Sequence, residues 1–203
     1  MADDQAKSME LRLHDPERDT APYQQLAIAR AGAIQAYASV ESSISMLFAT
    51  LLGTDFETAG IVFFRIVNTR ARVVILEDLL EKRHKDRYAT YWNSMVKLIR
   101  SLDAKRNEIV HWHLAHNLHI EGDRPTAHFT LIPPNFWTKT DVKTLTPNDL
   151  IEFSRKCDFV SRSLVMFFVM LTNRLPEPSP WLEIFQQPAA YPPPDNHPLA
   201  RKP

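Results

Sequence analysis

One short stretch of the sequence carries side chains suited to chemistry, Arg106-Asn107-x-x-x-His111. A guanidinium group presents a planar fork of donors to an anion, and an exposed histidine titrates near neutral pH, as a general acid or base must. Asn107 and His111 are four residues apart and share a helix face, whereas Arg106 lies roughly 100–140° around the helix from them. We therefore expect His111 to be exposed or at an interface, away from the centre of the fold.

Arg106 also occupies a position in an apolar stripe where a leucine would be typical. Glu41 interrupts the apolar stripe of another predicted helix in the same way. An isolated buried charge is costly, and the usual remedy is a hydrogen-bonded opposite charge. We therefore predict a buried Glu41–Arg106 ion pair. This pair is either purely structural or also holds the guanidinium at the mouth of a cleft, with donors free for an anion.

A metal site is the main alternative, because histidines cluster after residue 110 and two Glu-x-x-His patterns occur, Glu81–His84 and Glu108–His111. Paired patterns of this kind hold di-iron centres in helical bundles. The helices that carry them are joined by a turn near residue 85, so Glu81 and Glu108 lie roughly 33 Å apart at ~1.5 Å rise per residue. The two patterns cannot share a metal ion within one chain, and we expect neither a metal site nor a cofactor.

Apolar periodicity predicts the elements that position these residues: four long helices, over about residues 22–52, 57–83, 86–113 and 147–175. Thr146 as N-cap, Pro147 in the first turn and Asp149 mark the start of the fourth helix. Residues 115–134 are typical of a β-hairpin with a turn at Gly122-Asp123. The fold class is therefore all-α, an antiparallel four-helix bundle with a small β-hairpin insertion between helices three and four.

The ends of the chain differ from this middle part. Residues 1–19 are charged and aperiodic, which predicts a flexible arm, and residues 20–175 form the helical domain. Nine of the fifteen prolines follow residue 175, so residues 176–203 cannot form a long helix and are expected to be an extended tail that lies across the bundle or a partner chain. Cys157 falls on the apolar stripe of the fourth helix and is expected to be a buried structural thiol.

Composition limits the partners. The 203 residues contain 24 Lys plus Arg and 24 Asp plus Glu, so no global field attracts nucleic acid and any such contact needs a local patch. A single cysteine and a polar, acidic amino terminus without a signal peptide are typical of a cytoplasmic protein. The longest apolar run, residues 164–171, is too short to span a membrane.

The stretch LDAKRNEIVHWH, residues 102–113, resembles the signature of the HEPN superfamily. These are helical-bundle proteins, many of them metal-independent ribonucleases, whose motif is Arg followed after four to six residues by His, often with Asn after the Arg. Arg106 and His111 match the four-residue spacing, and Arg106 and His113 match the six-residue spacing. We prefer His111, since the form with Asn107 is the commoner one, and keep His113 as a supporting candidate. The resemblance covers residues 20–175 loosely.

The resemblance implies a concrete mechanism. In active members two chains pair so that two copies of the motif face one cleft. Arg106 would bind the phosphate and stabilise the charge that develops on it, and His111 would act as general base or acid on the ribose 2′-hydroxyl and the leaving oxygen. Asn107 would orient His111 or the phosphate. The product would carry a cyclic phosphate, and DNA would not be cut because it lacks the 2′-hydroxyl.

Three hypotheses follow. The first is a HEPN-type endoribonuclease acting at a homodimer cleft, of toxin or phage-defence type, with an antitoxin as a further partner. The second is a HEPN-like binding or dimerisation module without catalysis, which the neutral net charge favours slightly. The third is an unrelated helical protein in which Arg106 and Glu41 are purely structural.

Overall fold

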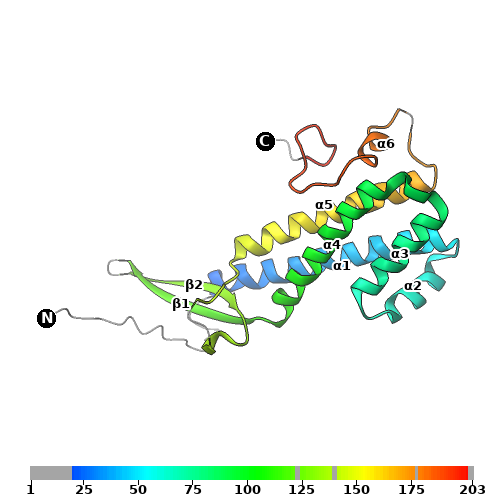
Figure 1. Cartoon of the computed structure of the whole chain (residues 1–203). Helices are drawn as coiled ribbons and strands as arrows, with labels where there is room; N and C mark the ends of the chain where they lie inside the picture. Colours follow the sequence, from blue (N-terminus) through cyan, green and yellow to red (C-terminus); the bar gives the residue numbers. More distant parts are fainter. Residues whose placement is uncertain (1–19, 122–123, 139–140, 177, 201–203) are drawn as a thin grey trace.

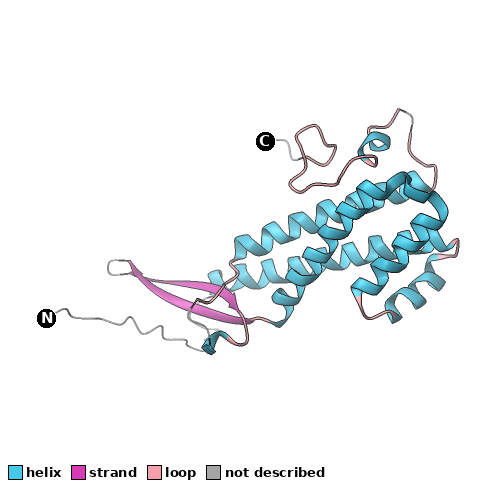
Figure 2. Cartoon of the chain, in the orientation of Figure 1, coloured by secondary structure: helices cyan, strands magenta, loops and turns pink. Residues whose placement is uncertain are grey.

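The computed structural model describes residues 20–121, 124–138, 141–176 and 178–200. The expected amino-terminal arm and the Gly122-Asp123 turn lie outside these residues. The described chain is mostly helical, with one two-stranded antiparallel sheet, and this confirms the coarse expectation from the sequence (Figures 1 and 2).

Three long helices run alongside one another: α1 (Thr20–Leu52), α4 (Ala89–His111) and α5 (Pro147–Leu171) (Figure 1). Each contributes one apolar face to a common core, because its buried residues recur at steps of three and four. The fully buried members include Leu47, Met95 and Val160.

The start of α5 matches the prediction from the sequence. The Thr146 hydroxyl accepts a hydrogen bond from the backbone N–H of Asp149 at 3.3 Å, and the Asp149 carboxylate accepts one from the backbone N–H of Thr146 at 2.8 Å. This reciprocal capping box satisfies two donors at the helix start. Cys157 is buried on the inner face of α5, where burial raises the pKa of its thiol to about 12.

The expected second helix is instead two helices, α2 (Phe56–Arg65) and α3 (Thr69–His84). The break falls at Asn68, whose side chain accepts a hydrogen bond from the backbone N–H of Arg70 at 2.8 Å and caps α3. Asparagine favours helix starts over helix interiors for this reason. Among the described residues no single helix is long and apolar enough to cross a membrane. Helices α1 and α2 have the necessary length and apolar composition only when they are taken together, and the chain bends by 116° between them.

The third predicted helix is shorter at both ends than expected. A 3₁₀ turn over Lys85–Tyr88 precedes α4, and α4 ends at His111 because Trp112 has an extended backbone. The chain then enters β1 (His113–Glu121), which pairs antiparallel with β2 (Arg124–Ile132). The predicted hairpin is confirmed, and Figure 2 shows it projecting beyond the end of the helices.

The proline-rich segment after residue 175 folds back along α4 and α5 (Figure 1). It contains the short helix α6 (Trp181–Ile184). Phe185 is fully buried, with its ring centroid 4.9 Å from that of Tyr91. The backbone N–H of Ala189 donates to the Ser94 hydroxyl at 2.7 Å. The sequence analysis left open whether this tail lies across the helices of its own chain or across a partner chain. In the structure it lies across the helices of its own chain.

Candidate anion-binding site at the carboxyl end of α4

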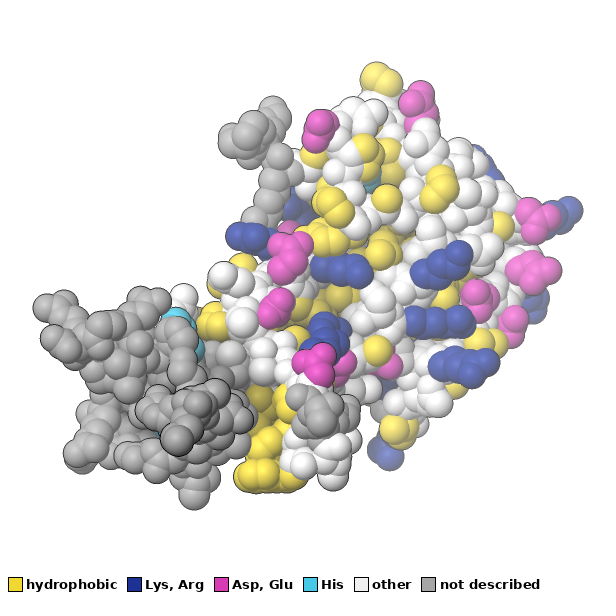
Figure 3. Space-filling model, turned by 60° about the vertical axis from the view of Figure 1, so that its left-hand side comes forward, with side chains coloured by type: hydrophobic (Ala, Val, Ile, Leu, Met, Phe, Trp, Pro, Cys, Tyr) yellow, Lys and Arg dark blue, Asp and Glu magenta, His cyan; other side chains and the backbone are white. Residues whose placement is uncertain are grey.

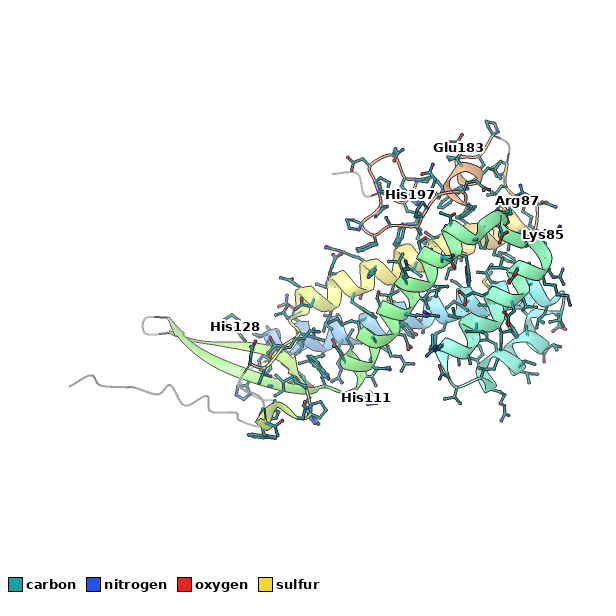
Figure 4. All side chains as sticks on the ribbon, in the orientation of Figure 1. Lys85, Arg87, His111, His128, Glu183 and His197 are labelled. Carbon is teal, nitrogen blue, oxygen red and sulfur yellow. The ribbon has the colours of Figure 1, made fainter. Side chains whose placement is uncertain are left out.

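The predicted motif lies on the last turns of α4, as the sequence indicates. Asn107 and His111 are exposed and Arg106 is partly buried. His111 is the last residue of the helix, and Figure 4 shows it at the end of α4 beside the start of the hairpin. The expectation that His111 lies outside the core is confirmed. His113 is exposed too, but it stands at the first position of β1 and not on the helix.

An arginine that we did not single out from the sequence holds this helix end. Arg30 on α1 donates from Nε to the carbonyl oxygen of Ile109 at 2.9 Å, and its terminal nitrogen donates to those of Val110 at 2.9 Å and Trp112 at 3.2 Å. The last carbonyls of a helix have no partner within it, and a cation there also opposes the negative end of the helix dipole. Arg30 therefore fixes the turn that presents His111.

A signal for Arg30 was present in the sequence. The buried positions of α1 include Leu26, Ala33 and Tyr37, and Arg30 falls at the helical spacing between the first two of these. It interrupts an apolar stripe as Glu41 and Arg106 do, so the same argument that selected those two residues applies to it.

Arg106 rests on an aromatic ring. Its guanidinium carbon lies 5.1 Å from the centroid of the Tyr37 ring, and one terminal nitrogen donates to the Asn107 side-chain oxygen at 3.0 Å. No carboxylate pairs with it among the residues that the structure describes. A stacked guanidinium with one neutral hydrogen-bond partner keeps most of its five donors available for an anion.

Tyr37 is itself held by a hydrogen-bond network under Arg106. Its hydroxyl donates to the carboxylate of Asp103 at 2.7 Å, and the hydroxyl of Thr69 donates to the same oxygen at 3.0 Å. Burial, followed by this hydrogen bond, raises the pKa of the Tyr37 phenol far above its usual value. The phenol therefore stays neutral and its ring stays fixed, which gives Arg106 a rigid platform.

The predicted Glu41–Arg106 ion pair is wrong. Glu41 accepts a hydrogen bond from Arg72 at 2.7 Å, and Arg72 also donates from Nε to the Ile66 carbonyl oxygen at 2.7 Å. The break between α2 and α3 places Arg72 at the start of α3, facing α1. Glu41 is thus satisfied inside the fold, and Arg106 has no acidic partner among the residues that the structure describes.

Two lysines lie beside the motif. Glu108 pairs with Lys105 at 2.7 Å and with Lys143 at 3.1 Å, and the Lys143 ammonium lies 5.8 Å from the Trp112 ring centroid. Partial burial acts to raise the pKa of Glu108, but the hydrogen bonds from the two lysines outweigh it, and its pKa lies below the usual value. Asp149 also lies close enough to both lysines for their charges to interact, so two carboxylates balance the two ammonium groups beside Arg106.

Figure 3 shows one face of the molecule, on which basic and acidic side chains are interspersed over the helical part. The motif therefore depends on Arg106 and its immediate neighbours, and not on the net charge of the chain, which is zero.

The structure separates the two Glu-x-x-His patterns, since one lies at the carboxyl end of α3 and the other at the carboxyl end of α4. Glu108 is engaged by lysines. Within the described ranges no group of three or more His, Cys, Asp or Glu side chains is placed to hold a metal ion.

Comparisons with known proteins do not assign this chain to a family. No family model, curated protein or solved structure matches this chain. The likeness to the HEPN superfamily consequently rests on residues 102–113 and on their place at the end of a long helix, and it stays a prediction.

Proposed function

We propose that the carboxyl end of α4 is one half of a HEPN-type, metal-independent endoribonuclease site, completed by a second copy of the chain. The observation that carries the proposal is the state of Arg106, which is stacked on Tyr37 and hydrogen-bonded to Asn107, and which has no carboxylate partner in the described part of the chain. An arginine held in this way is prepared for a phosphate oxygen. In this proposal α1, α3, α4 and α5 correspond to the four helices of the bundle.

The reaction follows from the chemistry of the three motif residues. One His111 takes the proton of a ribose 2′-hydroxyl as that oxygen attacks the adjacent phosphorus. Arg106 stabilises the negative charge on the phosphoryl oxygens, and the bond to the 5′-oxygen breaks as the other copy's histidine returns a proton to it. The products are a 2′,3′-cyclic phosphate and a 5′-hydroxyl. Asn107, four residues before His111 on the same face, orients the histidine or the phosphate.

A second chain is part of the proposal because the motif lies on an open surface. Asn107, His111 and His113 are all exposed. Apolar side chains reach the solvent nearby, including Val110 on α4, 37% exposed, and Ile34 on α1, 42% exposed. A homodimer that buried this apolar surface would bring two motifs together and exclude water from them. We place such an enzyme in the cytoplasm, with an antitoxin as its natural inhibitor.

A second candidate, a binding or dimerisation module without catalysis, is favoured by one observation. The chain is neutral, and basic and acidic side chains are interspersed on the face that Figure 3 shows, whereas nucleases that bind a long substrate need basic surface around the cleft. In this case Arg106 would hold a phosphate or a partner's carboxylate and His111 would have no proton to transfer.

The test is cleavage of several structured and single-stranded RNAs in EDTA by the wild-type chain, Arg106→Ala and His111→Ala. Arg100→Ala, an exposed arginine on the same helix, is the matched control, and His113→Ala decides between the two histidines. We expect wild type, Arg100→Ala and His113→Ala to cut, and the other two to lose at least 100-fold in rate.

Two further outcomes distinguish the hypotheses. If wild type is inert but binds RNA, and Arg106→Ala does not, the chain is a binding module. If all variants cut equally, the motif assignment is wrong. Sedimentation of each variant checks that the dimer persists, so that a lost site is not confused with a lost partner.

A further inference from the structure

Helix α2 carries an exposed apolar surface at the end of the molecule opposite the hairpin (Figure 1). Among its ten residues only Ala59 and Phe63 are buried. The side chains of Phe56, Ile61 and Phe64 are 58%, 64% and 55% exposed. Large apolar side chains that gather in this way on a surface mark a site of contact with another molecule.

The surface is large enough to form one half of a stable interface. Val67, two residues after the helix, is 90% exposed. Together with Phe56, Ile61 and Phe64 it presents roughly several hundred Å² of apolar area to the solvent. A stable complex buries about 800 Å² on each partner, and the polar side chains of α2 supply the remainder.

The shape of this surface fits a second copy of itself. Gly60 is four residues from Phe56 and four from Phe64, so the three residues share one face of α2. A Cβ added at Gly60 would meet no atom within 4 Å, so nothing in the described chain requires a glycine there. Glycine inside a helix costs roughly 1 kcal/mol relative to alanine. It leaves a notch between two projecting rings, which is self-complementary about a twofold axis.

Both phenylalanines are held in place before a partner binds. The Phe64 ring centroid lies 5.2 Å from that of Phe63 and 5.6 Å from the Arg72 guanidinium carbon. The Phe56 ring centroid lies 6.1 Å from that of Phe168 on α5. Side chains that are already ordered lose little conformational entropy on association.

The charges on α2 select an antiparallel pair. Glu57 lies in the first turn and Arg65 in the last turn, and both are exposed. Neither forms an ion pair within the described chain. When two α2 helices cross antiparallel near Gly60, Glu57 of each copy lies beside Arg65 of the other, whereas a parallel pair places like charges together. An anionic lipid surface would attract Arg65 but repel Glu57, so it matches these charges less well.

We propose that α2 is a homodimer interface, in which two copies of the chain pack their α2 helices antiparallel around Gly60. This interface is distinct from the motif face. Phe48 on α1 contacts Phe63 on α2, with ring centroids 5.6 Å apart. Phe48 is 18 residues from Arg30 on the same helix, which is roughly 27 Å at ~1.5 Å per residue. The proposal is therefore independent of RNA cleavage at the end of α4.

The test is the mass of the full chain in solution, measured by sedimentation velocity at low and high micromolar concentration. Phe64→Asp removes an apolar anchor, and Leu182→Asp, at a side chain of α6 that is 43% exposed, is the matched control. We expect Phe64→Asp to weaken association at least 100-fold and to halve the mass, and Leu182→Asp to associate as wild type does. If the motif face pairs as well, the mass falls from four chains to two and RNA cleavage persists.

Reversal of single charges tests the direction of packing. Glu57→Arg and Arg65→Glu each place like charges together in an antiparallel pair, and each should weaken self-association roughly tenfold. An equal mixture of the two variants restores opposite charges at both contacts and should recover association. Gly60→Leu fills the notch and should also weaken association roughly tenfold, although one chain alone has room for the side chain. Circular dichroism checks that each variant keeps its helices.

The proposal is overturned if wild type and folded Phe64→Asp have the same mass, whether both are monomers or both associate through another face. It is also overturned if the mixture of charge variants fails to recover association, or if Gly60→Leu associates as wild type does. Vesicles of anionic phospholipid test a membrane as the occupant. If wild type binds them without a change of mass between wild type and Phe64→Asp, and Phe64→Asp does not bind, the surface belongs to lipid.

Discussion

Arg72 at the start of α3 and Arg106 near the end of α4 both rest on aromatic rings, and they differ in what else they contact. Arg72 lies 4.6 Å from the Phe63 ring centroid, is 8% exposed, and is paired with Glu41. Arg106 lies over Tyr37, is partly exposed, and contacts the neutral Asn107. The Arg72 guanidinium is used by the fold itself, in an ion pair with Glu41. The Arg106 guanidinium still has donors available for a molecule from solution.

The largest effect on stability is expected for Arg72→Ala. Loss of Arg72 leaves Glu41 inside the fold without a partner and removes a hydrogen bond to the Ile66 carbonyl oxygen. We expect the free energy of unfolding to fall by about 3 kcal/mol, near the low end for broken buried pairs because Glu41 is still in part solvated. Urea denaturation measures this, with the exposed Arg70→Ala as control. If Arg72→Ala lowers the free energy of unfolding no more than Arg70→Ala does, the distinction between a structural Arg72 and an available Arg106 is wrong.

Arg30→Ala is expected to rank second. Three carbonyl oxygens at the end of α4 lose their donor, which should cost about 2 kcal/mol and loosen the last turn. Hydrogen exchange should show faster exchange of the amides around Ile109 and Val110, while the amides at the start of α4 keep their protection. Uniform acceleration along α4 would show that Arg30 supports the whole fold and not this turn.

Arg106→Ala should have a much smaller effect on stability. The stacking on Tyr37 and one exposed hydrogen bond are worth under about 1 kcal/mol together. The same variant should lose RNA cleavage or, for a binding module, RNA affinity. A stability loss as large as that of Arg72→Ala, with RNA activity intact, would make both arginines structural.

The smallest effect concerns the pH dependence contributed by Glu108. Because its folded pKa lies below the usual 4.5, its ion pairs stabilise the fold above that pH and are lost as pH falls through the folded pKa. The side chain is about one-third exposed, so solvent reduces the effect to a few tenths of a kcal/mol. Glu108→Gln should narrow the stability difference between pH 7 and pH 3 by this amount. Glu81→Gln, which removes an exposed carboxylate that has no ion pair in the described chain, should leave that difference unchanged.

The sequence predicted those features that depend on local patterns. Apolar periodicity located α1, α4 and α5, the Thr146 capping box located the start of α5, and alternation located the hairpin. Exposure of His111 followed from its angle on the helix relative to the apolar stripe. These predictions do not require knowledge of which helices and strands pack against one another.

One error is local, because the cap at Asn68 divides the expected second helix and apolar periodicity alone did not reveal it. The other error concerns a contact between elements, because only that division places Arg72 opposite Glu41. Periodicity fixes the face on which a charge lies but not the depth at which a partner helix presents the opposite charge.

The single residue between α4 and β1 has a mechanical consequence. His111 closes the helix, Trp112 is the only linker, and His113 opens the strand. The hairpin is therefore joined to the motif histidine through one residue, and Arg30 holds that residue by its hydrogen bond to the Trp112 carbonyl oxygen. A molecule that bound the strands and moved them would also move His111 without contacting it, and the ring resonances of His111 would report that movement.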